Sequence, residues 1–405
     1  MSKFIFWALA SHGPGISGGD RIYIEFTKRW STKYPVRIVS WQEGADMMSR
    51  NGLSHRKNIS FDLVYIPNWP RSNFFICYIS RIIIGIFKSL ILKISHPQTT
   101  YLYSASEFWM DSLPCWILKL RYPEVRWIAT WFQTAPSPIK GFSSGTRSEV
   151  YRLNAFLLWA SQLPIKPLIA KSADFILVNN DLEKRVFPNS RTIIVLGAVN
   201  IDEIDTYLNK SIFKKKKYAA VFQGRFHPQK GVVELVDIWQ LVTRRYQGAK
   251  LAMIGDGPLM PEVKSHIEKL GLQKNIDLFG YVFDGPEKYR IFSQSKIVIH
   301  PAFFDSGGMA AAEAMAFGIP AVGFNLPAFS TYYPVGMVKV PVGDLNAFAD
   351  AIIVLLIDSK HRNNLGQQAK KFIRQSYSWD HRSSQILRQI VEKTIQEKDR
   401  AILQK

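Results

Sequence analysis

The chain has 405 residues, of which 47% are hydrophobic and 21% are charged, a balance typical of a globular protein rather than a disordered one. A chain of this length can form two domains, each with its own core. Its two cysteines make no disulfide framework and lack metal-ligand spacing, which fits a reducing compartment. The net charge of +20 favours an anionic partner such as an acidic lipid surface, nucleic acid or a phosphorylated acceptor. No signature of an RNA- or DNA-binding module is present, so nucleic acid is an unlikely partner.

Short apolar runs alternate with helical segments along the chain, which predicts an α/β fold with mainly parallel sheets. The first set of runs extends from Phe4–Leu9 to Thr192–Leu196, and the second from Tyr218–Gln223 to Val338–Val340. A polar segment that ends in four lysines separates the two sets and is predicted to be a linker. The expected organisation is an N-terminal domain over residues 1–200, a linker over 201–217, a C-terminal domain over 218–375 and a helical tail over 376–405.

The first apolar run, Phe4–Ala10, is predicted to be a strand, and no cleavage-like segment of a signal peptide follows it. A glycine-rich loop comes next, and Gly18 and Gly19 stand where a helix is expected to begin. Glycines let the backbone approach a ligand closely, and a helix N-terminus favours an anion. Many α/β proteins have a glycine turn at this place, so the loop alone is a weak signal. His12 lies in the same loop, where a lone histidine is more often structural than catalytic.

The segment Tyr78–Ile94 is the nearest approach to a membrane span in this chain. It contains Arg81, Lys88 and Lys93, and it is too short and too charged to span a bilayer comfortably. Its polar positions fall on one stripe of a helix. Two interpretations remain open, namely a buried helix of the first domain and a basic amphipathic helix that lies on a bilayer.

Two cations flank one loop early in the second half of the chain. A strand leads into Gly224-Arg225, and Lys230-Gly231 follows after a short loop. Arginine offers a planar fork for phosphate oxygens and lysine a compact charge, so the pair can offset the negative charge that grows on a departing diphosphate. Two unrelated surface cations are the default interpretation of such a pair in isolation. The segment Leu251–Pro258 adds a strand and a glycine turn that suit either a simple bend or a nucleotide contact.

Residues 300–323 carry the most information. The strand Ile297–His300 runs into a loop with Asp305, a Gly307-Gly308 pair opens a helix, and Glu313 follows eight residues after the first acid. Glycines and a helix N-terminus at the end of a strand form a site for an anion. Acids on either side of a phosphate suit hydroxyl-rich groups, so the segment predicts a nucleotide-sugar site. An ordinary amphipathic helix capped by Asp and Gly is the alternative.

These motifs resemble those of the retaining glycosyltransferases of family 4, and the resemblance runs over nearly the whole chain. Glu313, Gly318 and Pro320 match the family pattern, whereas Asp305 replaces its usual first glutamate. The family also has a histidine after the strand that here ends in Phe132-Gln133, and this chain has none between His96 and His227. Gln133 is the candidate replacement, and both departures could tune the donor sugar or mark a weakened enzyme.

The resemblance implies a GT-B fold, in which two Rossmann-like doubly wound domains face a central cleft and the C-terminal helix, from residue 376, crosses back to the first domain. It implies catalytic roles for Arg225, Lys230, Asp305 and Glu313 and sugar or acceptor contacts for His12 and Gln133. The residues expected to bind the donor or its phosphates are Gly18, Gly19, Gly224, Gly255, Gly257, Gly307, Gly308, Met309 and Ala310. No metal and no cofactor are expected, because these cations and amides already meet the phosphates and no Asp-x-Asp occurs.

The expected reaction is transfer of a sugar from a nucleoside diphosphate-sugar, with retention, to a glycan or lipid-linked acceptor in cell-surface polysaccharide or glycoconjugate synthesis. The N-terminal domain would bind the acceptor and the C-terminal domain the donor. A cytoplasmic protein, peripheral on the inner face of the plasma membrane and in contact with anionic lipid, fits the charge of the first domain. A sugar-nucleotide epimerase of GT-B fold and a non-catalytic GT-B subunit that binds a partner remain as alternatives.

Overall fold

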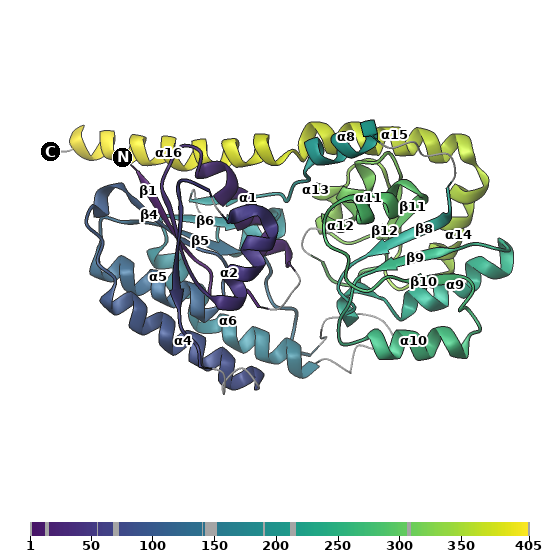
Figure 1. Cartoon of the computed structure of the whole chain (residues 1–405), viewed down its shortest axis with the longest axis horizontal. Coiled ribbons are helices and arrows are strands. Elements are labelled where there is room, and N and C mark those ends of the chain that lie inside the picture. The colour runs from purple at the N-terminus through teal and green to yellow at the C-terminus, as the bar shows by residue number, and fades with distance from the viewer. Residues whose placement is uncertain are drawn as a thin grey trace. The chain divides into compact units, whose positions relative to one another are not determined.

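The computed structural model describes residues 2–12, 16–54, 56–67, 73–139, 141, 152–188, 191–210, 216–305 and 309–403. The chain forms two compact units, and each is described by itself (Figure 1). Unit 1 contains residues 1–135, 157–196 and 380–405, and unit 2 contains residues 136–156 and 197–379.

Unit 1 is built on a seven-stranded parallel sheet with the strand order β3-β2-β1-β4-β5-β6-β7. The order runs outward in both directions from a central β1–β4 pair, as in a doubly wound fold, and confirms the predicted α/β class. The strands are β1 (Lys3–Trp7), β2 (Val36–Trp41), β3 (Ile59–Val64), β4 (Thr100–Ser104), β5 (Arg126–Trp131), β6 (Phe175–Val178) and β7 (Thr192–Ile194).

Helices cover both faces of this sheet because side chains alternate between its faces along each strand. Ile5 and Trp7 share a core with helices α4, α5 and α6, whereas Phe4 packs against Trp30 of α1 on the opposite face. The indole N–H of Trp30 donates to the Ser383 carbonyl of α16, which therefore covers the same face as α1. The helices are α1 (Gly18–Trp30), α2 (Gln42–Met48), α4 (Phe74–Ile91), α5 (Trp109–Arg121), α6 (Arg152–Ser172), α7 (Asp181–Val186) and α16 (Trp379–Leu403), with short turns at Ser49–Leu53 and Pro97–Thr99.

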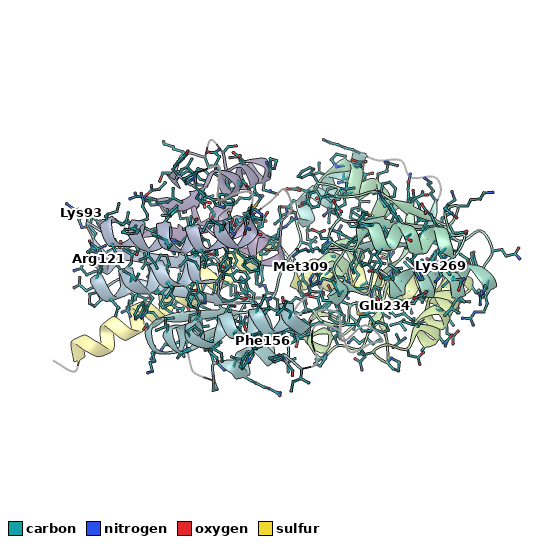
Figure 2. The ribbon with its side chains drawn as sticks, turned by 90° about the horizontal axis from the view of Figure 1, so that it is seen from below. Lys93, Arg121, Phe156, Glu234, Lys269 and Met309 are labelled. Carbon is teal, nitrogen blue, oxygen red and sulfur yellow. The ribbon has the colours of Figure 1, made fainter. Side chains whose placement is uncertain are left out.

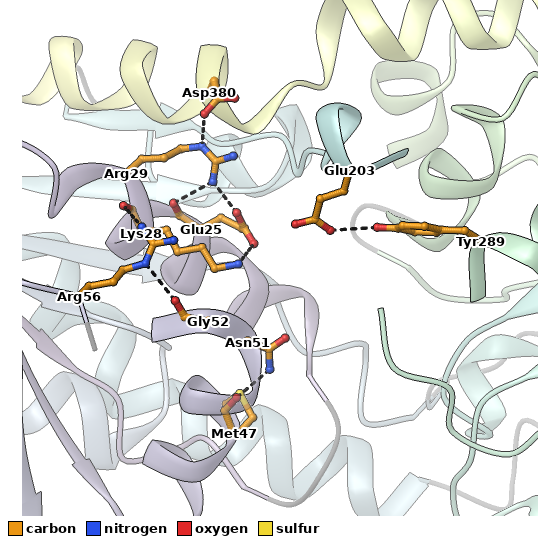
Figure 3. Close-up of polar contacts among 10 residues, drawn as sticks. All are labelled: Glu25, Lys28, Arg29, Met47, Asn51, Gly52, Arg56, Glu203, Tyr289 and Asp380. Atoms are coloured by element: carbon orange, nitrogen blue, oxygen red, sulfur yellow. Dashed lines mark hydrogen bonds and ion pairs between the residues drawn. The ribbon is translucent and has the colours of Figure 1, made fainter. Parts of the chain in front are cut away.

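The C-terminal helix α16 is attached to unit 1 by an ion pair as well as by packing. Arg29 of α1 reaches Asp380 at 2.6 Å and also pairs with Glu25 one turn earlier on its own helix (Figure 3). Burial acts to raise the pKa of Glu25, but Lys28 and Arg29 outweigh it and lower that pKa below its usual value. The predicted return of the C-terminal helix to the first domain is thus confirmed.

Unit 2 has a six-stranded parallel sheet with the order β10-β9-β8-β11-β12-β13, again with its first strand at the centre. The strands are β8 (Tyr218–Gln223), β9 (Leu251–Ile254), β10 (Ile276–Leu278), β11 (Ser295–His300), β12 (Ala321–Phe324) and β13 (Met337–Val340). Around them lie α8 (Ile201–Lys210), α9 (Glu234–Arg245), α10 (Met260–Lys269), α11 (Pro286–Ser293), α12 (Met309–Met315), α13 (Ala328–Tyr332), α14 (Leu345–Ile357) and α15 (Ser359–Ser376), with a short 3₁₀ turn at Pro228–Lys230.

The segment predicted as a linker, residues 201–217, is organised differently. Its first ten residues form helix α8, which belongs to unit 2, and Ile204 on this helix is buried. Glu203 accepts a hydrogen bond from the Tyr289 hydroxyl of α11 at 3.1 Å (Figure 3), and Asp205 pairs with Arg374 of α15. Polar composition suggested a linker because Ile204 is the one buried residue of α8, while polar residues of this helix make contacts within unit 2.

Candidate active site

Two loops of unit 2 meet at the carboxyl edge of its sheet, because β8 and β11 are hydrogen-bonded neighbours. The loop after β8 contains Arg225 and Lys230, and the loop after β11 contains Asp305. Gly231 allows the close approach, since it has φ +62° and an added Cβ would lie 2.1 Å from the Pro301 carbonyl oxygen. Any side chain here would push the two loops apart, so the glycine is part of the site's construction.

Lys230, Asp305 and His300 form a buried ionic cluster. The Lys230 ammonium lies 2.5 Å from Asp305 Oδ2, and His300 Nε2 lies 2.8 Å from the same oxygen. Burial acts to raise the pKa of Asp305, but Lys230 and His300 outweigh it and lower that pKa well below 3.8. Asp305 is therefore a carboxylate at neutral pH, and it fixes the direction of the Lys230 ammonium.

Arg225 is exposed, whereas the residues around it are packed. Its neighbour His227 has a pKa lowered to about 4 by burial and by the charges of Arg225 and Lys230, so this imidazole is neutral near pH 7. The exposed Arg225 side chain and the Lys230 ammonium both lie near His227. A guanidinium and an ammonium on one loop form an electropositive edge that suits phosphate oxygens.

The glycine turn after β9 packs directly onto the start of the β8 loop. Gly255 has φ +138°, and an added Cβ would lie 1.9 Å from the Gly224 carbonyl oxygen. An added Cβ at Gly257 would lie 2.6 Å from the Phe226 carbonyl oxygen. Both positions therefore require glycine for this close contact, and the contact fixes the backbone on either side of Arg225.

Glu313 lies on α12 and is held by a lysine that the sequence did not single out. Lys288 of α11 is almost completely buried, lies 2.7 Å from Glu313 Oε2 and also pairs with Asp284. A buried ammonium between two carboxylates orients both of them. The sequence signal was the four-residue spacing of Asp284, just before α11, and Lys288 on it, which is ordinary surface chemistry and gave no reason to connect them with Glu313.

The start of α12 is only partly described. The predicted phosphate ligands Gly307 and Gly308 lie outside the described residues. Met309 and Ala310 begin α12, and an added Cβ at Gly197 would lie 1.8 Å from Met309 Sδ. The junction glycine Gly197 thus lets the first residue of α12 pack against the chain that enters unit 2.

The predicted residues of unit 1 gather at the carboxyl edge of its own sheet. Helix α1 begins at Gly18, and an added Cβ at Gly19 would lie 3.2 Å from Phe132, the residue before Gln133. His12 pairs with Glu43 at 3.1 Å and stacks on Trp41. These contacts orient the His12 ring, which stays 46% exposed.

Two buried ionisable side chains that sequence reasoning did not assign hold the start of the loop after β1. Asp111 accepts from the amides of Leu9 and Ala10 at 2.6 and 3.1 Å, and burial raises the pKa of Asp111 to about 7. Arg81 donates to the carbonyls of the same two residues at 3.1 and 3.2 Å. The backbone amides and carbonyls of Leu9 and Ala10, at the start of this loop, are thus both held by buried side chains.

No group of three or more His, Cys, Asp or Glu side chains within the described parts of the chain is arranged to hold a metal ion. Arg225, Lys230 and Lys288 are cationic side chains of the candidate site.

Comparison with known proteins links this site to a family. Residues 203–372 match the family described as glycosyl transferases group 1. The chain is 28% identical over 202 residues to phosphatidyl-myo-inositol mannosyltransferase of Mycobacterium leprae, a match over 49% of this chain and 53% of that protein. It is 25% identical over 275 residues to poly(glycerol-phosphate) alpha-glucosyltransferase of Bacillus subtilis, over 63% of this chain and 36% of that protein. The chain thus spans about half the length, or less, of these relatives.

Solved structures share the fold across almost the whole chain. The structure of Anabaena Alr3699/HepE in complex with UDP-glucose superposes with a TM-score of 0.70 at 13% identity, over 97% of this chain and 100% of that one. Sucrose-phosphate synthase from Thermosynechococcus elongatus superposes with a TM-score of 0.71 at 17% identity, over 97% and 100% of the two chains. The two parallel α/β sheets are those of a GT-B fold, and the four candidate catalytic residues Arg225, Lys230, Asp305 and Glu313 all lie within residues 203–372, which match the family of glycosyl transferases group 1.

Proposed function

We propose that this protein is a retaining, metal-independent glycosyltransferase that moves a sugar from a nucleoside diphosphate-sugar to a glycan or lipid-linked acceptor. The observation that carries the proposal is the Lys230–Asp305–His300 cluster beside the exposed Arg225, at the carboxyl edge of a group 1 domain. The resemblance to family 4 supports retention at the anomeric carbon. Cell-surface polysaccharide or glycoconjugate synthesis is the setting in which such a transfer is used.

The proposed chemistry is stabilisation of the leaving group. Arg225 and Lys230 bind the diphosphate, with the amides of Met309 and Ala310 as further donors. An ammonium has three donors, so Lys230 can keep its bond to Asp305 and still reach a phosphate oxygen. As the bond between the anomeric carbon and the phosphate oxygen breaks, these charges stabilise the negative charge that develops on that oxygen.

The acceptor hydroxyl oxygen forms the new bond to the anomeric carbon on the same face, and its proton passes to the departing phosphate oxygen. No side chain is needed as a base, because the departing phosphate oxygen takes the proton. Asp305 accepts hydrogen bonds from hydroxyls of the donated sugar, and Glu313, held by Lys288, accepts them from the ribose. His12 and Gln133 remain the proposed acceptor or sugar contacts of unit 1.

The proposal includes a cytoplasmic location on the inner face of the plasma membrane, where lipid-linked acceptors are accessible. Cys77 and Cys115 are buried and unpaired, which fits a reducing compartment. None of the helices in the described ranges is long and apolar enough to cross a bilayer.

A donor panel tests the proposal. UDP-, GDP- and ADP-sugars are screened by thermal shift, because a ligand that binds the folded state raises the melting temperature. We expect one nucleotide class to stabilise the protein and to be hydrolysed slowly, and an acceptor to speed release of the diphosphate with retained anomeric configuration by NMR.

Other outcomes contradict the proposal. Conversion of the donor into an isomeric nucleotide-sugar without acceptor would show an epimerase. Binding of the donor with no release of the diphosphate under any acceptor would favour a non-catalytic subunit.

A further inference from the structure

Helix α4 buries Ile82 in the core, but it differs from an ordinary surface helix because it also buries a polar stripe and leaves a second apolar stripe exposed. Its inner stripe, at four-residue spacing, is Cys77, Arg81, Gly85 and Ser89, all of which are buried. Its outer stripe is Phe75, Ile79, Ile83, Phe87 and Ile91, all of which are exposed, with Phe75 and Ile91 65% and 71% exposed. The helix therefore presents its largest apolar side chains to solvent.

Specific contacts fix this orientation. An added Cβ at Gly85 would lie 3.1 Å from Pro114 and 3.3 Å from the Met110 carbonyl oxygen, so α4 packs closely on α5 at this glycine. Arg81 holds the carbonyls of the loop after β1, and Lys88 pairs with Asp62 of β3 at 2.6 Å. A half-turn rotation that buried the outer stripe would break all three contacts.

A further helix of the same face also has exposed apolar side chains. Helices α4, α5 and α6 share one core beneath the sheet, and Trp109 of α5 donates to the Ser161 carbonyl of α6 at 2.6 Å. In Figure 2 these helices form one face of their unit. Leu157 and Leu163 of α6 are exposed as well. Contiguous apolar patches of this kind mark sites of interaction with membranes or proteins.

The charge of this surface distinguishes between a membrane and a protein as its partner. The sequences of α4, α5 and α6 contain one acidic residue, Asp111, and it is fully buried. Exposed cations border the same helices, namely Lys93, Arg121, Lys166 and Lys171. Lys93 and Arg121 are seen at the same end of this face in Figure 2, where Arg121 also donates to the Leu92 carbonyl at 3.1 Å. Glu124, just after α5, is exposed as well, but the cations outnumber it, and a surface with an apolar stripe and an excess of cations is complementary to an anionic lipid surface.

The geometry points to the outer stripe of α4, with the adjoining cations of α5 and α6, as the surface by which this protein docks on an anionic bilayer. The aromatic and aliphatic side chains enter the interface between headgroups and acyl chains, while the lysines and arginine contact lipid phosphates. This inference goes beyond the proposed transfer reaction, since it concerns a surface that needs neither donor nor acceptor.

Vesicle flotation with the full chain tests the inference. The vesicles are phosphatidylcholine alone and phosphatidylcholine with phosphatidylglycerol, and no nucleotide-sugar is added. We expect binding to the anionic vesicles that weakens as salt is raised, and little binding to the neutral ones. Ile79→Ser with Phe87→Ser should weaken binding by about tenfold or more, because two inserted apolar side chains are lost.

A matched control comes from unit 2. Val354→Ser with Ile357→Ser removes two equally exposed apolar side chains from α14, and it should leave flotation unchanged. Unchanged melting temperatures of both variants show that the fold is intact. Three outcomes would overturn the inference. The α4 variant could float like the wild type, or the wild type could bind neutral and anionic vesicles equally. The wild type could also bind no vesicle and instead form a concentration-dependent dimer that the α4 substitutions abolish. Because no transfer is measured, these outcomes are independent of whether the glycosyltransferase proposal holds.

Discussion

Replacement of Lys230 by methionine removes one cation from a buried pair while it keeps most of the length of the side chain. Asp305 is only 9% exposed and Lys230 16%, so solvent screens their attraction weakly. Loss of one partner from a buried ion pair costs about 3–5 kcal/mol in general. His300 still donates to Asp305 at 2.8 Å, so we expect a loss of about 2–3 kcal/mol in the free energy of unfolding. The turnover rate should fall by about 10²–10³ because a donor to the leaving phosphate is lost.

The stability loss should depend on pH in a definite direction. A carboxyl group whose pKa is lower in the folded state stabilises the fold above its unfolded pKa, and this stabilisation is lost as pH falls through the folded pKa. In the wild type the folded pKa of Asp305 is well below 3.8, and in Lys230→Met it rises because burial then acts against a single donor. The difference in unfolding free energy between wild type and variant is therefore full at neutral pH, and it shrinks as Asp305 becomes protonated below about pH 4.

Urea unfolding at neutral and acid pH, together with the rate of donor hydrolysis, measures both effects. Lys250→Met, which removes an exposed lysine just before β9, is the matched control and should change neither quantity by more than about 0.5 kcal/mol or twofold. If Lys230→Met kept the stability and the turnover rate of the wild type, both the buried pair and its catalytic role would be refuted.

Arg225→Ala should lower the turnover rate by about 10²–10³ with almost no change in melting temperature, because this side chain is exposed; a normal rate in a stopped assay of diphosphate release would contradict its role. Lys288→Met should weaken nucleotide binding by about tenfold in calorimetry, because Glu313 loses its buried cation, and unchanged affinity would argue against a ribose contact. Gly255→Ala should destabilise the fold by more than about 2 kcal/mol in urea, because its Cβ meets a carbonyl oxygen at 1.9 Å. Gly248→Ala is its control, since φ is also positive there but no atom lies within 4 Å, and equal losses in the two variants would show that the close contact is unimportant.

The sheets were predictable because buried parallel strands form short apolar runs that periodicity detects. The runs Tyr218–Gln223 and Ile297–His300 agree with β8 and with most of β11. Helix α8 was missed because it buries little besides Ile204, and its polar side chains are satisfied by contacts with α11 and α15 that no local pattern reveals. Local composition therefore predicts a helix or strand only where most of its contacts come from buried apolar side chains.

The identities of several candidate site residues were predictable, but their pairings were not. Arg225 and Lys230 were found from their spacing after a strand, yet the contact between Lys230 and Asp305 joins residues 75 positions apart. Lys288 was missed because its partner Glu313 lies on a different helix. Ion pairs of this kind depend on strand order, which a single sequence does not contain.

The periodicity of the sequence was sufficient to predict that α4 is a helix, but not which of its faces is buried. The polar stripe through Arg81 and Gly85 was visible, and apolar burial would place it outside. In the structure that stripe is inside, because Arg81 finds two carbonyl acceptors and Gly85 allows close packing on α5. A buried charge with specific partners outweighed the burial of the larger apolar stripe.

The account depends most on the claim that a nucleoside diphosphate binds at Arg225 and Lys230. A crystal structure of the protein with a bound UDP or GDP, chosen from the donor panel, tests it most directly. We predict phosphate oxygens within hydrogen-bond distance of the Arg225 guanidinium and the Lys230 ammonium, with the ribose hydroxyls at Glu313. A nucleotide whose phosphates lie away from both cations would contradict the account.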